Sequence, residues 1–158
     1  MKLFSRFVLL LISMLIVSDI SLAGVLPRFA SLKSNEANLR TGPSKNYPIK
    51  WVIKNKGEPV EIVSEFEQWR EIKDKDGDSG WVHETMLSGS RYVVVVGDSL
   101  QFLYRNEDSD KKIAKVNPGV RARLLKCNEN RCYISLEKHK GWIGRKALWG
   151  IYKTEVFD

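Results

Sequence analysis

The chain repeats itself at a spacing of about 62 residues, and this repeat limits it to two small copies of one unit. Residues 56–63 resemble residues 118–125. The Gly-Trp-Val run at residues 80–82 returns as Gly-Trp-Ile at residues 141–143. Self-similarity at a fixed spacing indicates that each copy forms the same supersecondary unit. A unit of about 60 residues buries only a marginal core, so we expect the two copies to dock.

Each copy has the pattern of short strands joined by turns. In residues 120–124, apolar side chains alternate with Arg121 and Arg123, which is the period of a strand with one buried face. Residues 92–96 are a β-branched run that suits a strand covered on both faces. Turn sequences such as Asn117-Pro118-Gly119 recur at short intervals. The pattern therefore predicts an all-β chain.

The first 23 residues have the pattern of an export signal. Lys2 and Arg6 precede an apolar stretch at residues 7–17, and residues 21–23 form a small-x-small cleavage site. The apolar stretch is shorter than the roughly 20 residues of a membrane span. We therefore expect an exported protein of the periplasm or cell envelope, with no stable membrane span after cleavage. A retained membrane anchor is the alternative interpretation.

Positive charge is concentrated in the second half of the chain. Residues 24–90 contain 10 basic and 10 acidic residues, whereas residues 91–158 contain 14 basic and 8 acidic residues. In an exported protein this excess favours an anionic envelope polymer or surface as partner, and we expect no nucleic-acid partner. The sequence indicates no oligomeric state.

Two cysteines, Cys127 and Cys132, lie in the basic half with four residues between them. Export would place them where a disulfide persists, and opposite positions of a hairpin lie within bridging range, so a bond between them is predicted. Two histidines, His83 and His139, complete no zinc-ligand spacing. Residues 74–80 resemble the start of a calcium loop but lack its glycine and final glutamate, so a solvated hairpin turn is expected there and no metal site.

Four stretches together resemble the bacterial SH3-like (SH3b) family, and in particular two-copy exported proteins of alphaproteobacterial type. They are Asn-Leu-Arg-Thr-Gly-Pro at residues 38–43, Trp-x-x-Ile at 69–72, Gly-Trp-Val at 80–82 and Leu-Trp-Gly-Ile-Tyr at 148–152. The resemblance implies two tandem SH3-like small β-barrels after the signal peptide at residues 1–23. The first would span residues 24–88, and the second, diverged barrel would span residues 89–158, with a C-terminal packing segment. It also implies a binding role in the envelope, often toward peptidoglycan or peptides.

Candidate ligand-binding residues are of two kinds. Partly exposed aromatic rings can stack on a sugar or peptide, and clustered cations can attract an anionic polymer, although packing and dispersed surface charge are the ordinary roles of such residues. The aromatic candidates are Tyr47, Trp51, Trp69 and Tyr133, and the cationic candidates are Arg121, Arg123, Lys138 and Lys140.

No combination of residues indicates catalysis. Neither histidine has a cysteine or serine near it in a recognisable nucleophile motif, and no part of the chain remains for a separate catalytic domain. We therefore expect a protein that is not an enzyme, needs no cofactor and binds peptidoglycan or an envelope peptide or protein. A structural or regulatory adaptor that binds only another periplasmic protein is the alternative.

Overall fold

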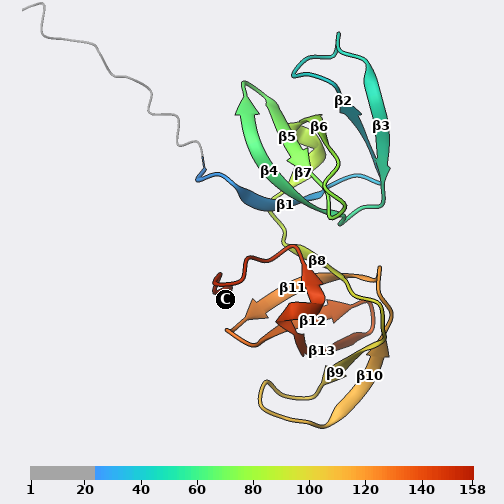
Figure 1. Ribbon diagram of the computed structural model, residues 1–158, viewed down its shortest axis with the longest axis vertical. Helices are drawn as coiled ribbons and strands as arrows, with labels where there is room; N and C mark the ends of the chain where they lie inside the picture. The colour runs from blue at the N-terminus through green and yellow to red at the C-terminus, as the bar shows by residue number, and fades with distance from the viewer. Residues whose placement is uncertain (1–23) are drawn as a thin grey trace, which may run out of the picture.

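The computed structural model describes residues 24–158, so the predicted signal peptide lies outside the described residues. It contains two seven-stranded antiparallel sheets, one after the other along the chain (Figure 1). We call them the first and the second module. The all-β fold expected from the sequence is confirmed. The first module contains β1 (Arg28–Leu32), β2 (Glu36–Arg40), β3 (Ile49–Lys54), β4 (Pro59–Phe66), β5 (Trp69–Lys73), β6 (Ser79–His83), η1 (Glu84–Met86) and β7 (Leu87–Ser88). The second contains β8 (Tyr92–Val95), β9 (Gln101–Tyr104), β10 (Lys112–Val116), β11 (Arg121–Cys127), β12 (Arg131–Leu136), β13 (His139–Gly144), η2 (Arg145–Ala147) and β14 (Leu148–Trp149).

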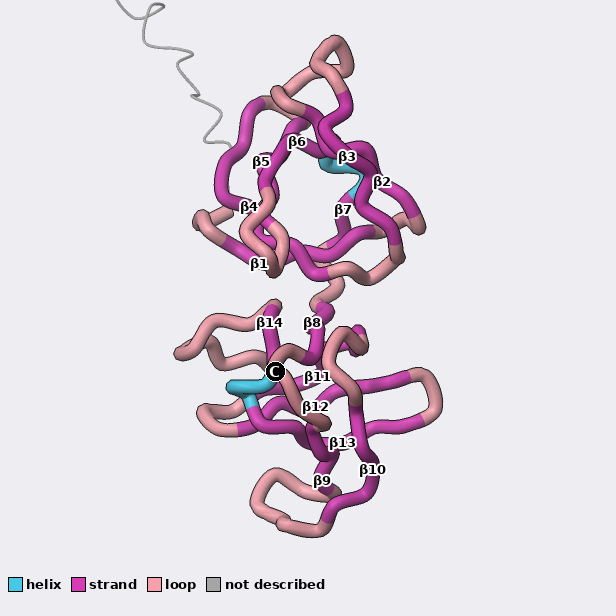
Figure 2. Tube along the Cα trace, turned by 45° about the vertical axis from the view of Figure 1, so that its right-hand side comes forward, coloured by secondary structure: helices cyan, strands magenta, loops and turns pink. Residues whose placement is uncertain are grey.

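The two modules have the same topology. Their strands follow the orders β3-β2-β6-β5-β4-β1-β7 and β10-β9-β13-β12-β11-β8-β14, which are identical when each number is raised by seven. The tube in Figure 2 shows the strands of the first module curling round an interior. Both modules carry a β-bulge at the same place, between Ile62 and Ser64 in one and between Leu124 and Lys126 in the other. The sequence repeat is therefore a repeat of structure.

Each module buries a core of its own. The first core includes Leu39, Val60 and Ile72, and the second includes Leu103 and Ile134, all of them almost fully buried. The predicted alternation on β11 is present, because Arg121 and Arg123 are exposed while Ala122 and Leu124 are buried.

The glycine before each repeated tryptophan allows two strands to approach closely. A Cβ atom added at Gly80 would lie 2.8 Å from Leu39 and 2.9 Å from the backbone oxygen of Arg40. At the equivalent Gly141, the added atom would lie 3.0 Å from Leu103. Side chains larger than hydrogen would push β2 away from β6, which explains the repeated Gly-Trp pair.

Aromatic packing joins the two modules. The ring of Phe29 on β1 contacts the ring of Trp149 edge-on at 5.1 Å between centroids, and the ring of Tyr152 at 4.6 Å. Tyr152 also donates a hydrogen bond from its hydroxyl to Glu61 on β4 at 2.8 Å. The C-terminal segment therefore packs between the modules.

An ion pair closes the same junction. Arg121 on β11 donates to the carboxylate of Glu58, which precedes β4 and is itself buried. Beside it, the ring of Tyr92 packs over Gly57 so closely that a Cβ atom there would lie 2.9 Å from the ring. Charge pairing and packing therefore both hold the modules together.

The predicted disulfide between Cys127 and Cys132 is present. The two cysteines face each other at the end of the β11–β12 hairpin. Cys127 also forms an isolated bridge with Phe157, whose oxygen accepts a hydrogen bond from the Cys127 nitrogen at 2.6 Å. The disulfide therefore fixes the hairpin end on which the C-terminal residues dock. Within residues 24–158 no helix has the length and apolar character needed to cross a membrane.

Candidate functional site

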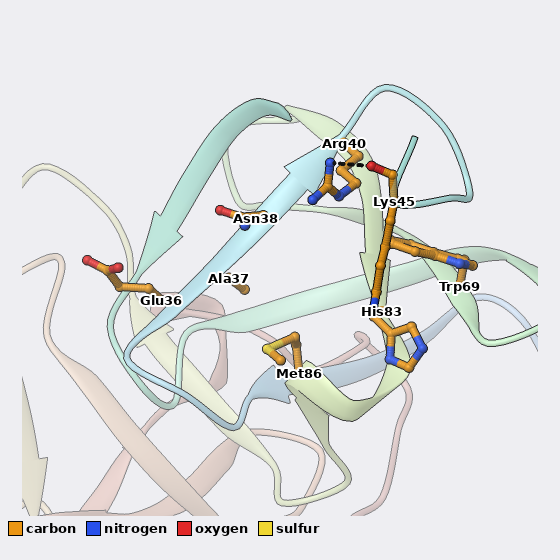
Figure 3. Close-up of a pocket in the computed structure, with 8 residues that line it drawn as sticks. All are labelled: Glu36, Ala37, Asn38, Arg40, Lys45, Trp69, His83 and Met86. Carbon is orange, nitrogen blue, oxygen red and sulfur yellow. Dashed lines mark hydrogen bonds between the residues drawn. The ribbon is translucent and has the colours of Figure 1, made fainter. Parts of the chain in front are cut away.

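A groove of about 360 Å³ opens on the first module, and we call it the first-module groove. Strand β2 forms one wall, and the start of β5, the end of β6 and η1 form the other (Figure 3). The residues that line the groove are Glu36, Ala37, Asn38, Arg40, Lys45, Trp69, His83 and Met86.

Arg40 shapes one end of the groove. Its guanidinium donates hydrogen bonds to the backbone oxygens of Lys45 at 3.0 Å and Tyr47 at 2.7 Å. These bonds hold the loop between β2 and β3 against the end of β2. As a result the side chain of Lys45 extends from the Arg40 end along the groove toward His83 (Figure 3).

The opposite wall is built from two rings and a short helical turn. The rings of Trp69 and His83 meet edge-on with centroids 5.4 Å apart. His83 also caps η1, because its Nδ1 accepts a hydrogen bond from the Thr85 backbone nitrogen at 3.4 Å; the same Nδ1 lies 2.8 Å from the Thr85 hydroxyl oxygen. Trp69 is only 8% exposed, whereas His83 is half-buried.

The groove offers both signs of charge together with an uncharged polar group. Glu36 lies at one end and Lys45 at the other, and the amide of Asn38 lies between them on β2 (Figure 3). The ion pair of Glu36 with Lys54 spans 3.7 Å between strongly exposed groups, so Glu36 can exchange that partner at little cost. Carboxylate, amine, amide and ring edge are the groups that orient a peptide in a concave site.

The equivalent position in the second module is occupied by the protein's own side chains. Strand register makes Tyr104 the counterpart of Arg40, because each lies opposite the repeated tryptophan. By the same comparison Arg131 is the counterpart of Trp69, and Gly144 that of His83.

Arg131 reaches across the space that is open in the first module. Its guanidinium stacks on the Tyr104 ring at 4.2 Å, donates to the backbone oxygen of Ser109 at 2.7 Å and pairs with Asp110 at 3.5 Å. Where the first module has Trp69 and Arg40, the second has Arg131 and Tyr104. The stacked pair of Arg131 and Tyr104 therefore fills the position that is open in the first module.

The three aromatic candidates of the first module lie in different places. Tyr47 is 46% exposed and packs against Gly42 outside the groove. Trp51 is half-buried against the first core, with the Lys50 amine 4.5 Å from its ring. Only Trp69 lines the groove, as part of its wall rather than as an exposed platform.

Sequence reasoning missed most of the groove. Glu36, Lys45, His83 and Met86 carry no pattern that distinguishes them from other surface residues. Asn38 and Arg40 gave a signal, because both stand in the Asn-Leu-Arg-Thr-Gly-Pro run that carried the family resemblance.

The candidates of the second module do not converge on one site. Arg121 is held by Glu58, and it lines a shallow pocket of about 430 Å³ together with Lys138. Tyr133 stacks on Trp142 with ring centroids 5.3 Å apart. Arg123 on β11 and Lys140 on β13 both lie opposite Ser135 on β12, which runs between those two strands. Arg123 also lines a separate pocket between the modules.

No cluster of three or more histidine, cysteine, aspartate or glutamate residues suited to a metal ion occurs in the described part of the chain. The loop that resembles a calcium site is a turn closed by its own groups. The side chain of Asp74 accepts backbone hydrogen bonds from Asp76 and Asp78, both at 2.9 Å.

Residues 33–89 match the family described as the bacterial SH3 domain. The chain is also 28% identical over 154 residues to the Bacillus subtilis protein YrvJ, named as an N-acetylmuramoyl-L-alanine amidase. That match covers 85% of this chain and 30% of YrvJ, so the chain spans less than a third of that relative.

Two solved structures are similar to the chain at lower identity. An NlpC/P60 family protein from Bacillus cereus has 14% identity and a TM-score of 0.35, over 77% of this chain and 55% of that one. NlpC2 from Trichomonas vaginalis has 15% identity and a TM-score of 0.36, over 78% of this chain and 48% of that one.

Proposed function

Since residues 33–89 are a bacterial SH3 domain, we propose that this protein is a non-catalytic binding module of the bacterial cell envelope and that it binds peptidoglycan through the first-module groove. The observation that carries the proposal is the contrast between the modules. The groove is open in the first and spanned by Arg131 in the second. A fold repeated twice with one concave site left open is suited to binding at that site.

The chemistry of the groove matches the peptides of peptidoglycan. These short peptides carry carboxylates, amines and amides, and the groove offers a lysine, a glutamate and an asparagine along one line. Complementary charges of this kind fix the orientation of a ligand more than they raise its affinity. The name of YrvJ, an amidase of N-acetylmuramoyl-L-alanine, refers to a linkage of the same polymer and supports this choice.

A protein ligand is the second candidate, because the edge strand β3 is exposed and apolar. Ile49 and Val52 on this strand are 49% and 41% exposed, and β3 ends the strand order of its sheet. An unpaired edge with apolar side chains can accept a strand from another chain. This feature favours an adaptor that binds an envelope protein and no cell wall.

Sedimentation with purified peptidoglycan sacculi tests the proposal. Asn38 on β2 is exposed, and its counterpart in the second module is Phe102. Asn38→Phe therefore places in the open groove the side chain that the fold tolerates at the equivalent position. We expect this variant to bind sacculi at least tenfold more weakly, which corresponds to about 1.4 kcal/mol.

Asn106→Phe, an equally exposed site on the second module, is the matched control and should bind like the wild type. Wild-type protein that stays in the supernatant, or equal binding by both variants, would contradict the proposal. Incubation with sacculi should also release no soluble fragments, as expected of a protein without catalytic groups.

The proposed export to the cell envelope can be tested separately. If residues 1–23 act as an export signal, mass spectrometry of the protein from its native host should find a mature N-terminus at or near Gly24. A full-length chain found only in the cytosol would contradict export.

A further inference from the structure

A second pocket, of about 320 Å³, lies between the two modules, and we call it the junction pocket. Its lining comes from β1 and the residue that follows it, the turn before β4, β7 and the linker after it, and strands β8 and β11. The lining residues are Ser31, Leu32, Lys33, Lys56, Ser88, Ser90, Tyr92 and Arg123. None of them is assigned to the first-module groove.

The charge of this lining is entirely positive. Lys33, Lys56 and Arg123 line it, and no aspartate or glutamate does. In residues 24–158 none of these three cations forms an ion pair. Two other cations at the junction are neutralised, because Arg91 pairs with Glu155 and Arg121 with Glu58. Of these five cations, the three that line the pocket are therefore the ones without a carboxylate partner in the described residues.

Neutral donors accompany the cations. The hydroxyl oxygen of Ser88 accepts a hydrogen bond from the Ser90 nitrogen at 3.1 Å, so its own proton remains to donate elsewhere. Ser31 is different, because its hydroxyl donates to the Ser90 oxygen at 2.6 Å and thereby fixes the linker. Tyr92 adds a phenol from the second module.

The positive lining belongs to the junction rather than to the repeated fold. The backbone nitrogen of Lys33 donates to the backbone oxygen of Met86 at 2.8 Å, and the backbone nitrogen of Val96 donates to that of Ala147 at the same distance. These bonds make Val96 the counterpart of Lys33. The backbone nitrogen of Gly57, which follows Lys56, donates to Leu32 on β1, and that of Gly119, which follows Pro118, donates to Val95 on β8. Pro118 is therefore the counterpart of Lys56. Neither counterpart carries a charge.

From these observations we propose that the junction pocket binds a compact oxyanion, the group shared by phosphates and carboxylates, and that residues of both modules hold it. Three cations and at least one free hydroxyl donor surround the pocket, and no carboxylate opposes them. Like charges gathered around one concavity repel one another, and an oxyanion relieves that repulsion while accepting hydrogen bonds. Lys33 and Lys56 belong to the first module and Arg123 to the second, so the bound anion also braces the junction.

Titration of the protein with inorganic phosphate, and separately with acetate, tests this site. Both titrations are run at constant ionic strength adjusted with chloride, with the thermal midpoint and the amide NMR spectrum as readouts. We expect at least one anion to raise the midpoint in a saturable way, since a ligand that binds only the folded state stabilises it. The amide signals of Ser88, Ser90 and Tyr92 should shift with the same saturation.

A charge-matched pair of triple variants makes the test specific. Lys33→Gln/Lys56→Gln/Arg123→Gln should lower the affinity at least tenfold. The control Arg105→Gln/Lys111→Gln/Lys112→Gln removes the same charge from exposed positions of the second module that do not line the pocket, and should keep wild-type affinity.

The outcomes separate the possible sources of the anion. If only phosphate binds in a saturable way, the site is assigned to a phosphate group. If only acetate does, the site is assigned to a carboxylate. Equal binding of both shows a general oxyanion site. No saturable response, or equal loss in both triple variants, would overturn the proposal. Because no cell wall is used, its failure stays distinguishable from failure of peptidoglycan binding.

Discussion

Arg91 lies between two aromatic rings and beside a carboxylate. Its guanidinium carbon is 5.6 Å from the centroid of the Phe29 ring and 5.3 Å from that of Phe157. It pairs with Glu155 and donates to the backbone oxygen of Gly150 at 2.8 Å. Arg91 therefore connects β1 of the first module with three residues of the C-terminal segment.

Glu155 is the titratable member of this cluster. Burial by itself raises the pKa of Glu155, but hydrogen bonds from Arg91 and from the Tyr152 backbone, with the charges of Arg91 and Arg145, outweigh it. The pKa of Glu155 is therefore held below its ordinary value of 4.5. A carboxylate with a lowered pKa stabilises the fold above the unfolded pKa, and that contribution is lost as the pH falls through the folded value.

We therefore predict that Glu155→Gln lowers the free energy of unfolding at pH 7 by about 1–3 kcal/mol, the range for a hydrogen bond to a charged group. The variant should also lose less stability than the wild type between pH 6 and pH 3. Urea unfolding at both pH values measures the two effects. Parallel pH profiles for the two proteins would show that Glu155 does not contribute through its charge.

At the scale of elements, the disulfide between Cys127 and Cys132 stabilises one hairpin. It joins cysteines five positions apart at the end of the β11–β12 hairpin, so the loop that it closes is short. A short loop has little entropy to lose in the unfolded chain, which predicts a contribution of about 2 kcal/mol.

Replacing both cysteines with alanine, Cys127→Ala/Cys132→Ala, should lower the free energy of unfolding by about 2–3 kcal/mol, because two buried sulfur atoms are lost as well. The β circular dichroism spectrum should remain. Guanidinium unfolding of the variant and of the oxidised wild type measures the difference. A loss of the β signal itself would mean that the hairpin cannot form without the bond.

Strands were easier to predict than the groove, and the reason is physical. The alternation at Arg121, Ala122 and Arg123 reflects a sheet with one buried face, and this period is visible in any single strand. The groove depends on Asn38 and His83, which belong to β2 and β6 and have no fixed spacing in the chain.

The predicted role of Arg121 illustrates the same limit. The position of Arg121 on the exposed side of β11 was predicted correctly, but its partner Glu58 lies 63 positions earlier, across the junction. Long-range docking of this kind leaves no local pattern, so the cation looked available for a ligand. Trp69 shows the converse, because it was a candidate for a partly exposed ring and is in fact buried.

At the scale of the whole molecule, the pair of Arg121 and Glu58 gives a test of docking. Glu58 is almost fully buried, so Glu58→Arg places two cations together at the junction and should lower the free energy of unfolding by about 3 kcal/mol or more. The exchange Glu58→Arg/Arg121→Glu should recover part of that loss. Thermal unfolding of the wild type, both single variants and the double variant measures the coupling; additive effects would show that the pair does not hold the modules together.

The filling of the second groove by Arg131 has a consequence for valency. Two copies of a binding fold in one chain normally allow simultaneous engagement of a repeating polymer, and the second contact then raises the apparent affinity by avidity. Here the stacked pair of Arg131 and Tyr104 occupies the position equivalent to the first-module groove, so within residues 24–158 one of these two equivalent positions is open. A ligand that enters this groove should therefore titrate one-to-one, and the protein should decorate a polymer strand without cross-linking it to another.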